Sequence, residues 1–384
     1  QWRTNARMPS ETPKFHRMSG HGKLESSRID PHEKVDISLG EFRMAKRLVL
    51  FNHKGGVSKT TTVYNLGWRL ADQGHRVLLV DADPQCNLSS LILGSGWDGY
   101  YLEEETRLQN SKDGVAPAFS GKPTPIQPVV CKSPARQPRV HLLAGHATLS
   151  EYDASLTFAQ TSNALATLQN LPGAFQELIR QVEEANQIEY TIVDLNPGLS
   201  AINQNLFLNS DFILIPTNPD PFSIMALQTL ESIFPRWANW KTGSESAFQD
   251  SAYPLRSGMP RFVGTVIQRF NVRQGRAAAP YRDNIAEIKI VTQNRLYSAL
   301  RNAGLTLPDD DYPSGLRNNG YCLDEIQDFG ALLPRSHEVG VPVFALLDDE
   351  LGATGIVLEN TINKRNHIRE QFDAAAQTLK ALMG

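Results

Sequence analysis

Cysteine is scarce in this 384-residue chain, and Cys86, Cys131 and Cys322 lie far apart. None of them has the C-x-x-C spacing of thiolate metal sites or redox pairs. The sequence therefore indicates neither a disulfide framework nor a cysteine-rich metal site. Because scattered cysteines of this kind are typical of proteins in a reducing compartment, we expect a cytoplasmic location.

Long apolar runs are also missing, since no stretch reaches the ~20 residues of a membrane-spanning helix. The N-terminus lacks the apolar core of a signal peptide, and we expect no membrane partner. The net charge of −3 excludes a protein that is basic over its whole surface. Any contact with nucleic acid must therefore come from a local basic patch.

The chain divides into a tail and one large domain. Residues 1–43 mix basic, acidic, Ser and Pro residues with almost no apolar periodicity, which predicts a disordered tail. A DNA-binding arm is the alternative, because the tail begins with the basic residues Arg3, Arg7, Lys14 and Arg17. Residues 44–384 have enough apolar content for one α/β domain. Within it, the segments near 94–138 and 241–260 predict insertions or loops.

A short apolar run, Leu48–Phe51, leads directly into the glycine-rich segment Lys54–Thr61. Gly55 and Gly56 carry no Cβ, so their N–H groups can approach the oxygens of a phosphate chain. The helix predicted next, Lys59–Gln73, directs its N-terminal dipole at the same anion. This order of strand, loop and helix predicts a phosphate-binding site, and a surface turn without a ligand is the alternative.

Two side chains of the loop add chemistry of their own. Lys59 offers a positive charge to the β- and γ-phosphates of ATP, and Thr60 offers a hydroxyl to Mg²⁺. The residues that we expect to bind the nucleotide here are Lys54, Gly55, Gly56, Val57, Ser58, Lys59, Thr60 and Thr61.

The loop departs from the ordinary G-x-x-x-x-G-K-[ST] pattern, because His53 and Ser58 stand where that pattern has glycine. It resembles instead the deviant Walker A motif, K-G-G-x-x-K-[ST], of the ParA/MinD family of P-loop ATPases. In that family the additional lysine, which corresponds to Lys54, crosses to the phosphates of a partner subunit. The family usually has glycine at the position of Ser58, and if the position needs a positive φ, serine costs about 1 kcal/mol there.

A second predicted strand, Arg76–Val80, ends in Asp81-Ala82-Asp83-Pro84-Gln85-Cys86-Asn87. Ligands in open α/β sheets bind at this carboxyl edge, where carboxylates can hold the waters of Mg²⁺ and orient the water that attacks the γ-phosphate. The segment resembles the D-x-D-P-Q-x-N switch I of the same family, which implies that Asp83 positions the water and Asp81 lies near the metal. A helix cap at Asp83 is the alternative.

A third predicted strand, Tyr190–Asp194, also ends in a carboxylate. Asp194 matches a Walker B role, in which the carboxylate reaches Mg²⁺ through water, and a cap on the next helix is the alternative. With Thr60 and Asp81, it completes the residues expected near the metal. The segment that begins at Asn196 corresponds to the family's switch II. The family usually has proline at the position of Asn196.

The alternation of strands and helices continues to the end of the domain. Further strands are predicted at 140–146, 211–217 and 261–268, and helices at 149–156, 164–186 and 224–234, the last of them ended by Pro235. This alternation predicts a doubly wound, mostly parallel sheet flanked by helices. Gln268, at the end of its strand, resembles the family's base-contacting Asn and is expected to pair with the edge of adenine. A surface polar residue is the alternative.

Two features near the C-terminus bear on partners. A basic cluster predicts a solvated helix face, with a DNA surface as the alternative, and consists of Arg269, Arg273, Arg276, Arg282 and Lys289. The last helix has apolar residues at helical spacing, namely Ile362, Ile368, Phe372, Ala375, Leu379 and Leu382. That stripe predicts a helix docked on the core rather than a membrane anchor.

The resemblance covers residues 44–384 and implies a ParA/Soj-type partitioning ATPase. Such an enzyme hydrolyses ATP with Mg²⁺, and catalytic roles are implied for Lys54, Lys59 and Asp83. ATP binding makes the family's proteins homodimers that bind double-stranded DNA without sequence preference, and a ParB-like partner can stimulate them. We therefore expect a cytoplasmic protein associated with the nucleoid. A MinD-like positioning ATPase and a ParA-like regulator of a phage, plasmid or defence module are the alternatives.

Overall fold

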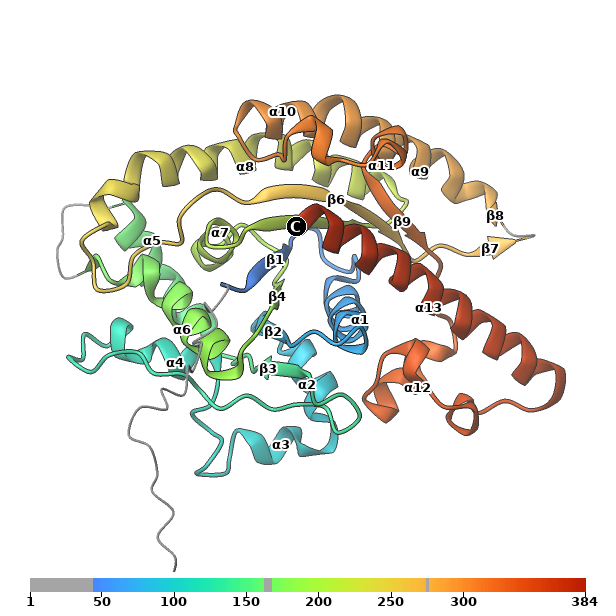
Figure 1. Ribbon diagram of the computed structural model, residues 1–384, viewed down its shortest axis with the longest axis horizontal. Helices are drawn as coiled ribbons and strands as arrows, with labels where there is room; N and C mark the ends of the chain where they lie inside the picture. Colours follow the sequence, from blue (N-terminus) through green and yellow to red (C-terminus); the bar gives the residue numbers. More distant parts are fainter. Residues whose placement is uncertain (1–43, 162–167, 274–275) are drawn as a thin grey trace, which may run out of the picture. The chain divides into compact units, whose positions relative to one another are not determined.

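The sheet at the centre of this protein consists of parallel strands. The computed structural model describes residues 44–161, 168–273 and 276–384, and within them seven strands pair in the order β3-β2-β4-β1-β5-β6-β9 (Figure 1). Each neighbouring pair is parallel. The predicted doubly wound α/β fold is confirmed. The predicted tail at 1–43 and the start of the helix predicted from residue 164 lie outside the described residues.

The strands of the sheet are β1 Lys46–Leu50, β2 Val77–Ala82, β3 Val140–Leu143, β4 Tyr190–Leu195, β5 Phe212–Thr217, β6 Arg261–Gln268 and β9 Cys322–Ile326. A short antiparallel pair is formed by β7 Val272–Arg273 and β8 Arg276–Ala277. The longer helices are α1 Lys59–Asp72, α5 Asp153–Thr161, α6 Leu171–Asn186, α7 Ala201–Leu208, α8 Pro221–Phe248, α9 Ala279–Val291, α12 Leu332–Val339 and α13 Gly355–Met383. The shorter ones are α2 Asn87–Leu93, α3 Trp97–Tyr100, α4 Ser111–Phe119, α10 Tyr297–Asn302 and α11 Ser314–Asn318.

Helices cover both faces of the sheet. Helix α1 packs on β2 and β4 and against α13, while α5, α6, α7 and α8 pack against one another on the other face (Figure 1). The strands β2 and β4 are buried along their whole length, as expected for a parallel sheet covered on both sides. Gly67 lets α1 approach β2 closely, because a Cβ at this position would come within 2.5 Å of Leu79 Cδ2.

The order of the strands opens a crevice at the carboxyl end of β1. Strand β1 lies between β4 and β5, and the chain adds strands on the β4 side first and on the β5 side afterwards. A reversal of this kind leaves room for a ligand between the loops that follow the two neighbouring strands. The register places Asp81 of β2 directly beside Asp194 of β4 at this edge.

Helix α8 shows that one prediction was wrong. It runs from Pro221 through Pro235 to Phe248, so the helix does not end at Pro235 and the predicted loop at 241–260 begins as helix. A proline inside a helix costs about 3 kcal/mol, because it removes an N–H donor and crowds the preceding turn. The apolar face of α8 continues past the proline, and its packing outweighs that cost. The buried apolar residues of this face are Ala226, Leu227, Leu230, Ile233, Phe234, Trp237, Ala238 and Phe248.

Strand β9 and helices α3 and α4 have no counterpart among the predicted elements. The middle of β9 carries Asp324 and Glu325, so the strand lacks an apolar run. Helix α4 lies in the segment predicted as an insertion, where the side chain of Asn110 caps it by accepting bonds from the N–H groups of Lys112 and Asp113. Because α4 packs on α6, tertiary contact stabilises it where the sequence has no helical period.

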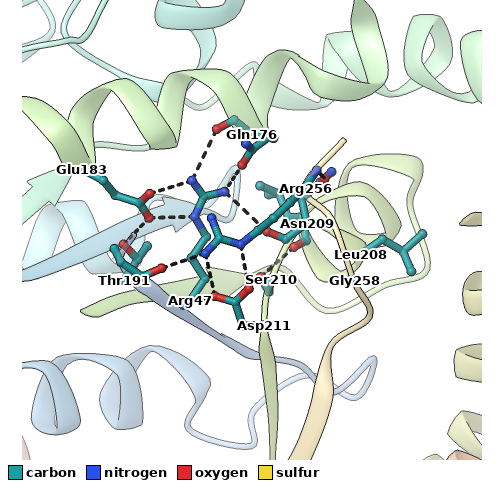
Figure 2. A network of polar contacts seen from close by, with 12 residues as sticks. Arg47, Gln176, Glu183, Thr191, Leu208, Asn209, Ser210, Asp211, Arg256 and Gly258 are labelled. Carbon is teal, nitrogen blue, oxygen red and sulfur yellow. Dashed lines mark hydrogen bonds and ion pairs between the residues drawn. The ribbon is translucent and has the colours of Figure 1, made fainter. Parts of the chain in front are cut away.

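A network of buried charges ties the elements together at the amino ends of the strands (Figure 2). Arg47 of β1 is only 1% exposed, and its Nε and Nη2 atoms each donate to Glu183 of α6 at 2.7 Å. The N–H of Arg47 donates to Asp211 at 2.8 Å, and Arg256 donates to the same carboxylate at 2.7 and 2.8 Å. Thr191 of β4 donates to Glu183 at 2.7 Å. These contacts join α6, β1, β4 and the start of β5.

Lys241 of α8 adds a second buried cation beside this network. Its Nζ atom donates to the carbonyls of Leu208, Arg256 and Gly258 at 2.7, 2.6 and 2.6 Å. Leu208 is the last residue of α7, where the negative end of the helix dipole favours a cation. Burial lowers the pKa of Lys241 to about 8. A residue that the sequence placed in a loop therefore caps one helix from inside another.

Candidate functional site

A cavity of about 520 Å³ opens in the crevice at the carboxyl end of β1. One wall is the loop after β1 with the first turn of α1, from Gly56 to Thr61. The opposite wall comes from the C-terminal part of the chain and contains Gln327, Asp328, Phe329, Leu333 and His337. Asp83 and Gln268 also line the cavity. A space of this size, with apolar and polar walls, fits a small-molecule ligand.

The loop contains two residues with left-handed backbone conformations. Gly56 has a φ of +72° and Ser58 a φ of +60°. The positive φ at Ser58 meets the condition under which serine costs about 1 kcal/mol at this position. The carbonyl of Ser58 accepts bonds from the N–H and the hydroxyl of Thr62, at 2.9 and 2.8 Å, which fixes the start of α1.

Lys59 lies beneath the loop, almost completely buried. Its Nζ atom donates to the carbonyls of Asn52 at 3.0 Å and Lys54 at 3.3 Å. Burial lowers the pKa of Lys59, and the carboxylates of Asp194 and Asp83 partly offset this effect. Hydrogen bonds to neutral carbonyls offset only part of the free-energy cost of burying the charged ammonium. The site therefore favours an anion that enters the loop.

Asp81 and Asp194 lie side by side below the cavity and are fully buried. Asp81 accepts bonds from the N–H and hydroxyl of Ser89, at 2.8 and 2.7 Å, and burial raises its pKa to about 6. Both carboxylate oxygens of Asp194 are buried, and neither has a partner with full hydrogen-bond geometry within the part of the chain that the structure describes. Burial and, after it, the Asp81 carboxylate raise the pKa of Asp194, and the Thr60 hydroxyl lies close enough to lower it.

These residues fit a magnesium ion that is bound together with a phosphate ligand. Among the residues with described positions, no group of three or more His, Cys, Asp or Glu side chains could hold a metal alone. The buried oxygens of Asp194 are acceptors suited to the water shell of Mg²⁺, and the Thr60 residue lines the cavity nearby. Mg²⁺ commonly uses few carboxylates, several waters and substrate phosphates. Since Ser200 caps α7, Asp194 is not the cap of the next helix.

Asp83 lines the cavity at the point where β2 ends. Its Oδ1 atom accepts a bond from the N–H of Gln85 at 2.9 Å. Helix α2 begins at Asn87, with Cys86 in the cap position, so Asp83 does not cap a helix at Pro84. Its carboxylate is held in a turn that faces the ligand space.

Lys54 does not line the cavity and instead pairs with a neighbouring loop. Its Nζ atom lies 2.5 Å from Oδ2 of Asp220 and 3.0 Å from the hydroxyl of Ser223. The other oxygen of Asp220 caps α8 by accepting from the N–H of Ser223 at 2.8 Å. Gly55 is exposed and likewise does not line the cavity.

Gln268 lines the cavity, but its amide is already engaged. Its Nε2 atom donates to the hydroxyl of Thr62 at 2.5 Å. The next residue, Arg269, has a φ of +62° and donates through Nη1 to the carbonyl of Gly56 at 3.0 Å. Gln268, which the sequence assigned to the base, thus contacts the start of α1, and Arg269 contacts the phosphate loop.

The basic cluster of the sequence is partly used in internal contacts. Lys289 pairs with Glu325 at 2.5 Å and donates to Asn319 at 2.6 Å. Arg282 is exposed, and the side chains of Arg273 and Arg276 lie outside what the structure describes.

The sequence did not indicate the wall around Gln327–Phe329 or the contacts of Asn218 and Asp220. Asn218 follows β5 and donates to the carbonyl of Gly56 at 2.9 Å. These residues lie far from the loop in sequence, and the order of the strands brings them to it. For Asn218 and Asp220 the available signal was their position after the apolar run of β5, because parallel strands deliver such residues to one edge. Gln327–Phe329 follow β9, which has no apolar run.

The C-terminal helix docks on the core as predicted. Ile368, Phe372, Leu379 and Leu382 of α13 are buried. No helix in the described ranges combines the length and the apolar character that crossing a membrane requires.

The AAA domain family matches residues 45–239, which is just over half of the chain. The chromosome partitioning protein ParA of Caulobacter vibrioides is 30% identical over 183 residues, which cover 48% of this chain and 60% of that protein. Matches of this kind span about half to three fifths of the length of the curated relatives.

Two solved structures share the fold. An ATP complex of McdA from Cyanothece matches with a TM-score of 0.54 and 19% identity, over 88% of this chain and 97% of the other. The pNOB8 ParA bound to nonspecific DNA matches with a TM-score of 0.50 and 17% identity, over 88% and 98%.

Proposed function

Because the chain belongs to the AAA domain family and has the fold of ParA-type P-loop ATPases, we propose that it binds ATP in this cavity and hydrolyses it to ADP and phosphate. The observation that carries the proposal is the loop after β1. It places a buried lysine, two left-handed backbone positions and the N-terminus of α1 beside one cavity. The N–H groups of a helix start and a cation beneath it are the elements that hold a phosphate chain.

In the proposed reaction, residues of the loop bind the phosphates and residues at the strand ends bind the metal and the attacking water. Lys59 exchanges its carbonyl partners for the β- and γ-phosphates, and the N–H groups from Gly56 to Thr61 hold the phosphate oxygens. The Thr60 hydroxyl and the carboxylates of Asp194 and Asp81 would hold Mg²⁺, which when bound would neutralise charge at the phosphates. Asp83 accepts a hydrogen bond from the attacking water and orients it in line with the γ-phosphate.

Replacing Asp83 by alanine should slow ATP hydrolysis by at least about tenfold, because the water loses its orienting acceptor. ATP binding should stay within about twofold of the unchanged protein, since Lys59 and the loop remain. Steady-state turnover and calorimetric binding of a non-hydrolysable ATP analogue separate the two effects. The exposed Asp98→Ala variant serves as the matched control and should change neither. An equal loss of binding would assign Asp83 to the metal or to the fold instead of the water.

The proposed cycle also includes a homodimer that forms on ATP binding, with Lys54 reaching the phosphates of the partner subunit. The position of Lys54 outside its own cavity supports this, because its side chain does not point at its own nucleotide site. The complex of pNOB8 ParA with nonspecific DNA supports duplex DNA as the partner class. With a net charge of −3, a single chain offers a small basic patch, and a dimer joins two such patches. The role proposed is DNA partitioning, with a stimulating partner of the ParB type.

Lys54→Ala should abolish ATP-dependent dimerisation and weaken binding to a duplex of arbitrary sequence by at least about tenfold, because the second basic patch is lost. Each subunit should still bind ATP through Lys59. Sedimentation with ATP and gel retardation over a range of salt concentrations measure the two losses.

Asp220→Asn is the matched control for this experiment. Asparagine caps helices as well as aspartate does, and the exchange removes the ion pair but leaves Lys54 in place. This variant should still form the dimer. Salt-sensitive DNA binding by a monomeric Lys54→Ala variant would contradict the coupling and point to the basic residues of the N-terminal tail.

A further inference from the structure

The carbonyl of Gly56 accepts two side-chain hydrogen bonds from separate strands. Asn218, which follows β5, donates from Nδ2 at 2.9 Å, and Arg269, which follows β6, donates from Nη1 at 3.0 Å. Gly56 itself is exposed and has a left-handed φ, so its own backbone preference does not fix this peptide. Two donors on one carbonyl are therefore the contacts that hold it in one direction.

The direction of that carbonyl sets the direction of the next N–H. The peptide between Gly56 and Val57 is trans, so its C=O and N–H bonds lie in one plane and point in opposite directions. Asn218 and Arg269 hold the carbonyl on one side. They therefore turn the N–H of Val57 to the other side, and Val57 lines the cavity. An N–H that is already aimed needs no reorganisation when an anion arrives.

Arg269 has a left-handed backbone conformation directly after β6. Its φ of +62° is unusual for a residue with a Cβ, and its side chain is exposed. Strain of this kind is common at functional sites, where the surrounding structure holds a residue in a rarely populated conformation. Arg269 combines this left-handed backbone conformation with a hydrogen bond from its guanidinium to the phosphate loop.

We propose that Asn218 and Arg269 are positioning residues that hold the Gly56–Val57 peptide in its nucleotide-binding orientation. The two donors share one acceptor, so either one can hold the carbonyl when the other is missing. This inference rests on the proposed binding of ATP to the same loop. It assigns a positioning role to Asn218, which does not line the cavity, and to Arg269, which lines the cavity and also holds the loop.

A double-mutant cycle on the full chain tests this sharing. Asn218→Ala and Arg269→Met should each weaken the binding of Mg·ATP by no more than about threefold, whereas the double variant should weaken it by at least about 30-fold, because only then is the carbonyl released. Calorimetry in the absence of DNA gives the affinities. Hydrogen exchange of the loop peptide, without nucleotide, should be accelerated only in the double variant.

Arg282→Met is the matched control, since it removes the same charge from an exposed site on α9. It should bind Mg·ATP as the unchanged protein does. Three results would overturn the proposal. They are additive losses of Mg·ATP affinity in the two single variants, unchanged affinity in the double variant, and an equal loss of affinity in the Arg282→Met control. If the unchanged protein fails to bind Mg·ATP, the proposed function itself is wrong, and this outcome is distinct from the other three.

Discussion

Lys59→Ala should weaken the binding of Mg·ATP by at least about 100-fold, and hydrolysis should fall below detection. The ammonium is the main cation of the phosphate loop, and a hydrogen bond to a charged group contributes about 1.5–3 kcal/mol, so the loss of contacts to two phosphates reaches this size. Calorimetric titration of the nucleotide-free protein measures the affinity. Unchanged turnover in the Lys59→Ala variant would remove the basis for a nucleotide site at this loop.

The control for this variant must separate the loss of the site from the loss of the fold. Lys122 is exposed and lies in a loop far along the chain, so Lys122→Ala should bind Mg·ATP normally. Circular dichroism should show the same helical content in both variants. Because Lys59 hydrogen-bonds to the carbonyls of Asn52 and Lys54, a small loss of thermal stability is expected in Lys59→Ala alone.

Glu183→Ala should lower the free energy of unfolding by about 3–5 kcal/mol, because it leaves the buried guanidinium of Arg47 without its carboxylate. Thr191 also loses its acceptor, which adds an unsatisfied hydroxyl. Equilibrium unfolding in urea, with the slope compared between variants, measures the change.

The neighbouring residue provides the control. Glu184 pairs with Arg180 on the surface, so Glu184→Ala should cost less than about 1 kcal/mol. Replacing Arg47 and Glu183 together by methionine and leucine should restore much of the loss, because no unpaired charge then remains. If Glu183→Ala and Glu184→Ala lose the same free energy, the buried network contributes little to stability.

The parts of this protein that the sequence predicted are those whose chemistry is local. The phosphate loop could be recognised from its local sequence, because Gly55, Gly56 and Lys59 lie within a few residues of one another. Asp81 and Asp194 could be placed because each ends an apolar run, and parallel strands bring such ends to one edge. The structure confirms that these two residues are neighbours in the sheet.

The rest depends on contacts between distant segments. The hydrogen bonds of Asn218 and Arg269 to Gly56 require that β5 and β6 follow β1 in the sheet, and no local pattern encodes this order. Proline disfavours a helix locally, but α8 continues through Pro235 because its apolar face packs on the core on both sides of the proline. Lys241 is the first residue of the predicted loop at 241–260, whereas in the structure three carbonyls hold its ammonium in the interior.

Strand β1 joins the buried charge network to the phosphate loop. Arg47 is fixed at the amino end, and Leu50 delivers the chain to the loop only about 10 Å farther on, at roughly 3.3 Å per residue. Because β1 is paired on both sides, with β4 and β5, it cannot slide without breaking the register of both neighbours. The base of the phosphate loop is therefore a fixed point of the molecule. In the proposed ATPase cycle, we therefore expect displacements on nucleotide exchange in the loops that line the cavity, such as those after β2 and β4, and not in β1.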